Sequence, residues 1–166
     1  HPSAHVGIAV AAPQGLVGCV TADRGRPVWS VNVNEQFGGR GTEFGYSASP
    51  LVTEGLVILP VGGENASVGA LRCEDGSLAW KTPRDVKVSR TFSFSTPLAI
   101  EVGGKTQVVA PGSGAAISYD PTTGAEIWRA RYGEGYSVVP RPVFGHGLVF
   151  LASGFDNASA LAIRPD

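Results

Sequence analysis

Residues 116–129 read AISYDPTTGAEIWR, and within this stretch a glycine is followed four residues later by a tryptophan. The same spacing occurs at three places, which together use every tryptophan in the chain. The pairs are Gly25 with Trp29, Gly76 with Trp80, and Gly124 with Trp128. The tryptophans are 51 and 48 residues apart. A spacing of this size indicates an internal repeat, as in propellers, kelch-like units or helical arrays.

A second marker keeps nearly the same step, because Pro50, Pro97 and Pro142 are 47 and 45 residues apart. Within each unit, short stretches rich in Val, Leu, Ile and Ala alternate with Gly, Asn, Asp and Ser, a pattern typical of strands and turns. No amphipathic helical stripe of a dozen residues is present. The predicted strands lie within 5–11, 15–21 and 27–32; 47–54, 55–63, 67–76 and 77–83; 94–102, 106–112, 114–120 and 125–132; and 141–144, 147–154 and 159–164.

Four short antiparallel strands per repeat, with a tight turn before the last, are typical of a β-propeller blade. We therefore predict an all-β chain forming one partial propeller domain, 1–166, with about two complete and two partial four-stranded blades. The predicted blades are 1–40 (partial), 46–83, 94–132 and 140–166 (partial). Closed propellers have about 4 to 8 blades. The chain is accordingly interpreted as a fragment whose open ends need the remaining blades or a second copy to cover them.

The Gly and Trp of each pair have separate predicted roles. The glycine supplies the positive φ of the turn that joins the third strand to the fourth. The tryptophan on the outermost strand is predicted to pack across the next blade.

The 116–129 segment resembles the docking motif of the pyrroloquinoline-quinone-like repeat family, with Asp120, Thr123, Gly124 and Trp128 at matching positions. The second unit departs from the motif at Arg72 and Asp75, and the first has Thr21 at the Asp position; these changes are expected to weaken the side-chain bracing of the turn. The phrases FSFSTPL and YSVVPRPVFGHGLVF are similar to those of bacterial quinoprotein-like propellers, including the propeller lipoprotein of the outer-membrane barrel assembly machinery. The resemblance implies a periplasmic or otherwise extracytoplasmic location.

Composition excludes several partners. The chain is 43% hydrophobic and 16% charged, with a formal net charge of −1. It has no run of Lys or Arg, so the sequence predicts neither nucleic-acid nor anionic-lipid binding. No run of about 18 apolar residues is present, so no membrane insertion is predicted for this segment.

The two cysteines, Cys19 and Cys73, fall at non-equivalent positions of their repeats. They are interpreted as two buried or semi-buried thiols, with a disulfide as the alternative. Residues 16–19, LVGC, also match a lipoprotein signal, but Pro13 and Gly15 interrupt the preceding apolar run and no Lys or Arg precedes it. A strand residue in the first blade is the preferred interpretation of Cys19.

The sequence carries no recognised catalytic or metal-binding motif. His146, between two glycines, is interpreted as a solvated turn residue, with a functional histidine as the alternative. Asp156 and Asn157 either cap a turn or bind a cation, and the turn is preferred. Family dehydrogenases hold the quinone between a tryptophan and adjacent cysteines, with calcium on acidic and amide side chains. This chain has no adjacent cysteines, so we predict no catalytic residues, no cofactor and no metal in it.

Aromatic and arginine residues recur just before the proline-marked strands. The candidate binding face is Tyr46, Arg90, Phe94, Tyr136 and Arg141. Such residues carry much of the energy of protein interfaces. The alternative is that they plug the channel mouth or pack between blades.

These observations favour a non-catalytic extracytoplasmic propeller scaffold that binds a protein partner. Two alternatives stay open at this stage. One is a fragment of a pyrroloquinoline-quinone-dependent dehydrogenase whose quinone and calcium site lies in missing blades. The other is the sensor domain of a larger membrane protein.

Overall fold

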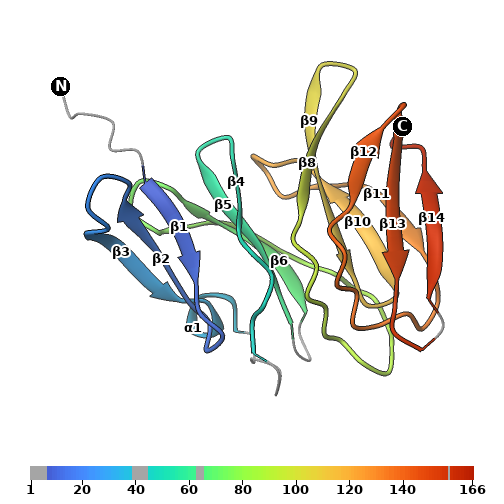
Figure 1. Ribbon diagram of the computed structural model, residues 1–166, viewed down its shortest axis with the longest axis horizontal. Helices are drawn as coiled ribbons and strands as arrows, with labels where there is room; N and C mark the ends of the chain where they lie inside the picture. The colour runs from blue at the N-terminus through green and yellow to red at the C-terminus, as the bar shows by residue number, and fades with distance from the viewer. Residues whose placement is uncertain (1–6, 39–44, 63–65, 157) are drawn as a thin grey trace.

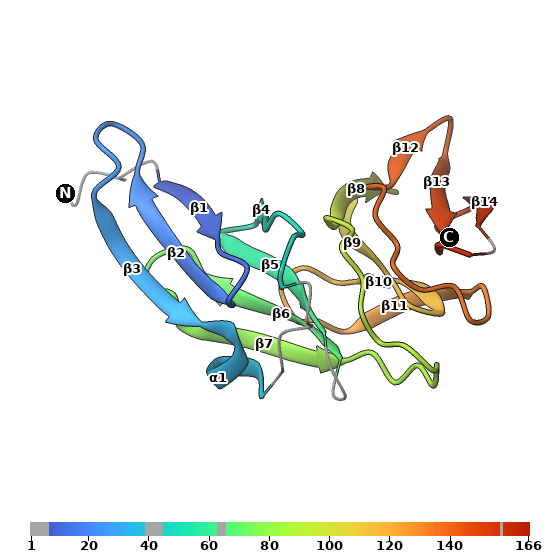
Figure 2. The ribbon, with the colours of Figure 1, turned by 60° about the horizontal axis from the view of Figure 1, so that its bottom comes forward.

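Four antiparallel sheets follow one another along the chain and stand side by side as successive blades (Figures 1 and 2). This arrangement comes from a computed structural model that describes residues 7–38, 45–62, 66–156 and 158–166. The predicted all-β propeller segment is confirmed. Every predicted strand is found, although residues 5–6 of the first one and residue 63 of the predicted strand 55–63 lie outside the described residues. Asn157, the candidate turn or cation residue, lies outside them as well.

Each sheet is a meander in which consecutive strands pair. Blade 1 contains β1 (Gly7–Ala11), β2 (Leu16–Thr21) and β3 (Pro27–Asn32). Blade 2 contains β4 (Leu51–Thr53), β5 (Leu56–Val61), β6 (Ser67–Arg72) and β7 (Leu78–Pro83). Blade 3 contains β8 (Leu98–Val102), β9 (Lys105–Gly112), β10 (Ala115–Tyr119) and β11 (Glu126–Arg131). Blade 4 contains β12 (Val143–Gly145), β13 (Leu148–Ser153) and β14 (Ser159–Ile163).

The two three-stranded blades differ in the strand they lack. In blade 1, β2 and β3 flank the Gly25 turn, so they correspond to the third and fourth strands of blade 2. The described part of blade 1 therefore lacks the innermost strand. In blade 4, β12 to β14 correspond to β8 to β10, so the described residues of this blade contain no counterpart of the outermost strand β11.

The apolar core lies between the blades, because a central strand buries both of its faces. On β5, Leu56 and Ile58 pack toward blade 3, whereas Val57, Leu59 and Val61 pack toward blade 1. A third cluster joins blades 3 and 4. This two-sided burial explains why β5 is a continuous apolar run rather than an alternating one.

One element was not predicted. Helix α1 (Val33–Phe37) follows β3, with the Asn32 side chain accepting a hydrogen bond from the Asn34 amide at 2.9 Å and Gly38 ending it at φ 60°. Val33 and Phe37 are buried. Asn before the helix and Gly after it were the signals, but five residues are too few for a visible periodicity. No helix among the described residues is long and apolar enough to cross a membrane.

Candidate interaction surface on the linker face

Because consecutive strands run in opposite directions, the connections between them lie at two opposite ends of the blades, and each end carries a different set of loops. One end carries the linkers between blades, 84–97 and 132–142, together with α1; we call it the linker face. The opposite end, the turn face, carries the three Gly turns, residues 21–26, 72–77 and 120–125. Helix α1 and the segment after β7 lie along the lower edge of Figure 1.

The three turns share one backbone design. In each turn, the amide of the first residue donates a hydrogen bond to the carbonyl of the sixth residue at 2.8 Å. The glycine amide donates a hydrogen bond to the carbonyl of the first residue at 2.9 Å. Gly25, Gly76 and Gly124 have φ of 64°, 73° and 71°. A register shift precedes every turn.

Side chains brace these turns differently. Asp120 accepts hydrogen bonds from the Thr122 amide and hydroxyl and from the Thr123 amide at 2.7 to 2.9 Å. These bonds, that of the Thr122 side chain first, hold the pKa of Asp120 below its ordinary value. In the second unit Asp75 accepts from the Ser77 amide, and in the first Thr21 accepts from the Arg26 amide. The departures from the family motif therefore replace the bracing with other bonds.

Two tryptophans dock on the turn of the following blade. Trp29 donates from Nε1 to the Cys73 carbonyl at 2.8 Å, and Trp80 donates to the Pro121 carbonyl at the same distance. A Cβ on Gly76 would lie 2.6 Å from the Trp29 ring, and one on Gly124 would lie 2.4 Å from the Trp80 ring. The glycines are therefore required for close approach as well as for the turn.

Trp128 packs differently from the other two. It is half-buried in the cluster between blades 3 and 4, and its Nε1 donates to Gln107 Oε1 within its own blade at 2.8 Å. Trp80 is 8% exposed. At the other end of the described chain, a Cβ on Gly25 would meet nothing within 4 Å.

On the linker face, two linkers run side by side. The Phe94 amide donates to the Val138 carbonyl at 2.9 Å, and the Ser137 amide to the Phe92 carbonyl at 3.3 Å. The serines of the FSFS sequence also form hydrogen bonds between the two linkers. Ser93 Oγ donates to the Val138 carbonyl at 3.2 Å, and Ser95 Oγ donates to the Pro140 carbonyl at 2.8 Å. Because successive side chains of an extended segment point to opposite sides, the serines face the neighbouring linker and the phenylalanine rings face the other side, where aromatic rings contact one another.

These rings form a contiguous group, the Tyr136 cluster, made of Arg90, Phe92, Phe94 and Tyr136. The Arg90 guanidinium lies 4.4 Å from the Tyr136 ring centroid, a cation–π arrangement. Phe92 meets Tyr136 edge-on at 5.8 Å and Phe94 at 5.8 Å. Arg90 is exposed and the three rings are half-buried.

Hydrogen bonds hold the cluster in place. The Tyr136 hydroxyl donates to Asp156, and this bond raises the pKa of Tyr136. Ser89 donates from its amide and its hydroxyl to Glu134 Oε2 at 3.1 and 2.9 Å, which lowers the pKa of Glu134. Asp156 therefore braces the surface as a turn residue.

A cleft of about 340 Å³ adjoins the cluster, lined by Tyr132, Glu134, Gly135, Tyr136, Phe155 and Asp156. The Phe155 side chain is 74% exposed beside it. Sequence reasoning missed Phe155, and it left Phe92 out of the candidate binding face although Phe92 lies between Arg90 and Phe94 in the same linker. An aromatic residue in the polar turn 154–157 was the available signal for Phe155.

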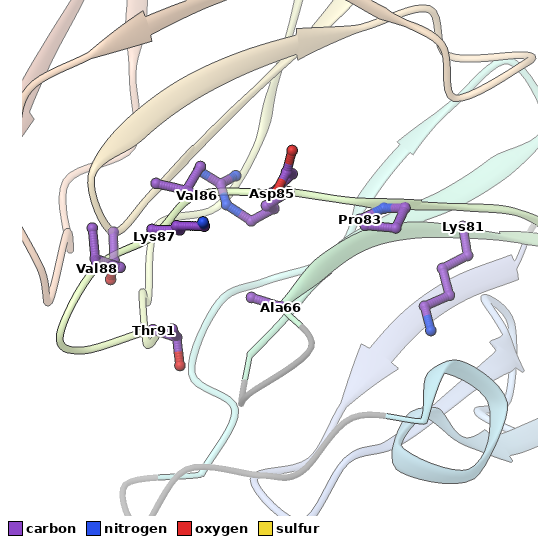
Figure 3. A pocket seen from close by; sticks show the side chains of 10 residues that line it. Ala66, Lys81, Pro83, Asp85, Val86, Lys87, Val88 and Thr91 are labelled. Atoms are coloured by element: carbon purple, nitrogen blue, oxygen red, sulfur yellow. The ribbon is translucent and has the colours of Figure 1, made fainter.

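A second cleft, of about 520 Å³, lies where β7 leads into the 84–97 linker (Figure 3). Its lining includes Lys81, Arg84, Lys87 and Asp85. The Lys81 amino group turns toward α1 and donates to the Phe37 carbonyl. Arg84 is 5% exposed, and its guanidinium donates to the carbonyls of Ala110 and Ala115 at 3.1 and 2.5 Å. Arg84 therefore ties this linker to blade 3.

The remaining candidate residues lie elsewhere. Tyr46 donates to Asn34 Oδ1 at 2.7 Å and packs against the core between blades 1 and 2. Arg141 is exposed in the 132–142 linker. His146 is exposed in the β12–β13 turn on the turn face, at φ 53°. The structure thus brings Arg90, Phe94 and Tyr136 together and leaves Tyr46 apart.

Two of the three tryptophan rings and both cysteines have defined positions in the packing of the blades. The Trp29 and Trp80 rings already lie against Gly76 and Gly124. Cys19 lies on β2 and Cys73 beyond β6, so neither supplies an adjacent pair. Among the described residues, no group of three or more His, Cys, Asp and Glu side chains could hold a metal ion.

A family profile described as outer membrane protein assembly factor BamB matches residues 2–165 of the chain. The chain belongs to the BamB family. This confirms the resemblance to quinoprotein-like propeller repeats. The curated BamB of Escherichia coli strain K12 is 34% identical over 88 residues, which are 49% of this chain and 21% of the relative. The matched segment thus spans about a fifth of that relative's length.

Solved structures agree on the fold of this BamB family member. BamB from Moraxella catarrhalis superimposes with a TM-score of 0.68 at 19% identity, covering 93% of this chain and 45% of that one. A quinohemoprotein alcohol dehydrogenase from Pseudomonas putida gives a TM-score of 0.67 at 17% identity, covering 98% and 31%. At such identities the likeness shows the propeller fold alone.

Proposed function

We propose that this BamB family member is a non-catalytic, extracytoplasmic scaffold that binds a protein of the outer-membrane assembly machinery through its linker face. Membership of a family described as an assembly factor supports the partner class. The same family relationship supports a periplasmic location. Structural likeness to a dehydrogenase does not favour an enzyme, because one propeller fold serves many functions.

The Tyr136 cluster is the observation that carries this proposal. An exposed arginine stacked on a tyrosine, next to an exposed Phe155 and a cleft, has the composition of an interface centre. The paired linkers below it hold the rings before any partner arrives, which lowers the entropy lost on binding. The four cluster residues and Phe155 therefore form the proposed contact surface.

Site-specific photo-crosslinking in the source bacterium tests the surface. A photoreactive residue at Phe155 should capture a protein of the outer-membrane assembly machinery, identified by mass spectrometry. The matched position is Thr122, which is exposed on the turn face. Equal capture from both positions, or no capture from Phe155, would contradict the proposal.

Titration with the captured protein then measures the contribution of the cluster. Arg90→Ala and Tyr136→Ala should each weaken binding about tenfold or more, as expected for residues at an interface centre. Arg24→Ala is the control, because Arg24 is an exposed arginine of the turn face. Unchanged affinity in both cluster variants would exclude this surface as the binding site.

We also propose that this segment binds neither pyrroloquinoline quinone nor calcium. A quinone needs a flat surface on each side, and calcium needs about six to eight oxygen ligands. Calorimetric titration of the purified chain with each should give no saturable heat. Stoichiometric binding in the micromolar range would instead favour a dehydrogenase.

A further inference from the structure

Cys19 and Cys73 come from different blades but line the same cavity. Cys19 is on β2 of blade 1 and is 9% exposed, and Cys73 lies in the turn after β6 of blade 2. The cavity between them has a volume of about 210 Å³. Its other lining residues are Gly7, Ala9, Trp29, Val52 and Val57. Both cysteines are free thiols in the structure.

Trp29 explains why two non-equivalent positions meet. Cys19 is the register partner of Trp29 on the neighbouring strand, so the two side chains share one face of blade 1. Trp29 in turn donates its Nε1 hydrogen bond to the carbonyl of Cys73 at 2.8 Å. Because the Trp29 ring docks on the 72–77 turn of blade 2, strand β2 with Cys19 lies close to the same turn.

The surroundings of Cys73 agree with this placement. Cys73 packs against the apolar cluster between blades 1 and 2, and its amide donates to the Gly55 carbonyl at 2.9 Å. Burial raises the pKa of the Cys73 thiol, and the nearby Cys19 raises it further. Both cysteines therefore belong to the same junction between blades 1 and 2.

We propose that Cys19 and Cys73 form a disulfide that joins blade 1 to blade 2 when the chain meets a disulfide oxidant. Face-to-face sheets are about 10 Å apart, a separation that disulfides span in immunoglobulin domains. The cavity provides room for the side-chain rotation that brings the two sulfurs into bonding distance.

The chemistry is a two-step thiol–disulfide exchange. The more exposed Cys73 attacks first as its thiolate, forms a mixed disulfide with the oxidant and releases one thiolate leaving group. Cys19, as its thiolate, then attacks the Cys73 sulfur and releases the second. Two protons and two electrons leave the protein in total, and one oxidant disulfide becomes two thiols.

The bond would hold a blade that packs on one neighbour among the described residues. Among the described residues, blade 1 packs on blade 2 alone, and its other face exposes Ile8, Val10, Leu16 and Val28. A cross-link at this junction limits opening of the first blade.

Oxidised glutathione is the probe. After incubation of the 166-residue chain, the intact mass should fall by two hydrogens, and trypsin should yield residues 1–24 joined to residues 73–81. The oxidised form should also melt about 5 °C or more above the reduced form, because the cross-link restricts the unfolded chain. Two reactive thiols after prolonged oxidation, or only glutathione adducts or linked dimers, would overturn the proposal.

Cys19→Ser and Cys73→Ser are the matched controls. Neither variant should give the joined peptides, and the melting temperature of each should be the same before and after oxidation. A rise of equal size in Cys19→Ser would show that the stabilisation does not come from this bond. The wild-type mass and peptide map remain decisive even if a variant folds poorly.

Discussion

At the scale of single residues, equivalent positions in the repeat have different surroundings. Trp80 is 8% exposed and docks on the next blade's turn, whereas Trp128 is half-buried and bonds within its own blade. The energetic role of a repeated residue therefore depends on whether the turn of another blade packs against it.

Trp80→Ala is expected to lower the free energy of unfolding by about 3 to 5 kcal/mol, because it leaves a large cavity between blades 2 and 3. Trp128→Ala should cost less, because its ring is only half-buried and does not dock on the turn of another blade. Urea unfolding followed by circular dichroism measures both. Equal losses would contradict the distinction between docked and undocked rings.

Tyr119 offers a second comparison. Its side chain is fully buried, and its hydroxyl has no hydrogen-bond partner. Tyr119→Phe should leave stability unchanged or raise it by up to about 1 kcal/mol, because an unsatisfied polar group is removed. Tyr132→Phe is the control, because the Tyr132 hydroxyl donates to the Gly112 carbonyl; it should lose about 1 kcal/mol. A clear loss in Tyr119→Phe would show that its hydroxyl is satisfied.

Asp120 predicts a dependence on pH. Its pKa is lower in the folded chain than its ordinary value, so its ionised form stabilises the fold. That contribution is complete above the ordinary pKa of about 4 and is lost as the pH falls through the lower folded value. When the pH is lowered from neutral to below the folded pKa of Asp120, the free energy of unfolding should therefore fall less in Asp120→Ala than in the wild type. Unfolding curves at both pH values measure this, and identical losses would contradict it.

At the scale of the turn and strand, one glycine has two separable tasks. Gly25 and Gly124 have nearly the same positive φ, but a Cβ would clash only at Gly124, 2.4 Å from Trp80. Comparison of the two positions separates backbone strain from the clash.

Gly25→Ala should cost about 1 kcal/mol, the strain of a left-handed alanine. Gly124→Ala should cost about 1 to 3 kcal/mol more, because the methyl group displaces the Trp80 ring. Thermal unfolding of both variants gives the difference. If the two substitutions cost the same, close approach of Trp80 is not what requires the glycine.

At the scale of the whole molecule, the terminal blades expose apolar side chains. Val10 in blade 1 is 45% exposed and Phe150 in blade 4 is 41% exposed, although both lie on strands. Exposed apolar sheet faces of this kind promote association.

The 166-residue chain is therefore expected to self-associate with rising concentration in sedimentation velocity. Val10→Lys and Phe150→Lys should each reduce association, because they place a charge on an exposed apolar face. Ile127→Lys is the control, because Ile127 is 46% exposed but belongs to blade 3, which has a neighbour on each side. Association that responds equally to all three variants would not arise from the terminal blades.

Strands and turns were predictable from sequence because their causes are local. Alternating and continuous apolar runs, with Gly, Pro and Asp between them, predicted all strands of the described chain, and the Gly–Trp spacing predicted the order of the blades. The short helix α1 was not predicted, because five residues carry too little periodicity.

Contacts between blades were decided only in three dimensions. Trp29 docks on the turn that contains Cys73, so Cys19 and Cys73 line one cavity although their repeat positions differ. The pairing of the 84–97 and 132–142 linkers likewise gathers Arg90, Phe92 and Tyr136, while Tyr46 packs elsewhere. By itself, the sequence determined the strands, the turns and the repeat, because these depend on neighbours along the chain. Tertiary structure decided the surface and the cysteine pair, because side chains from different repeats meet only after the blades have packed.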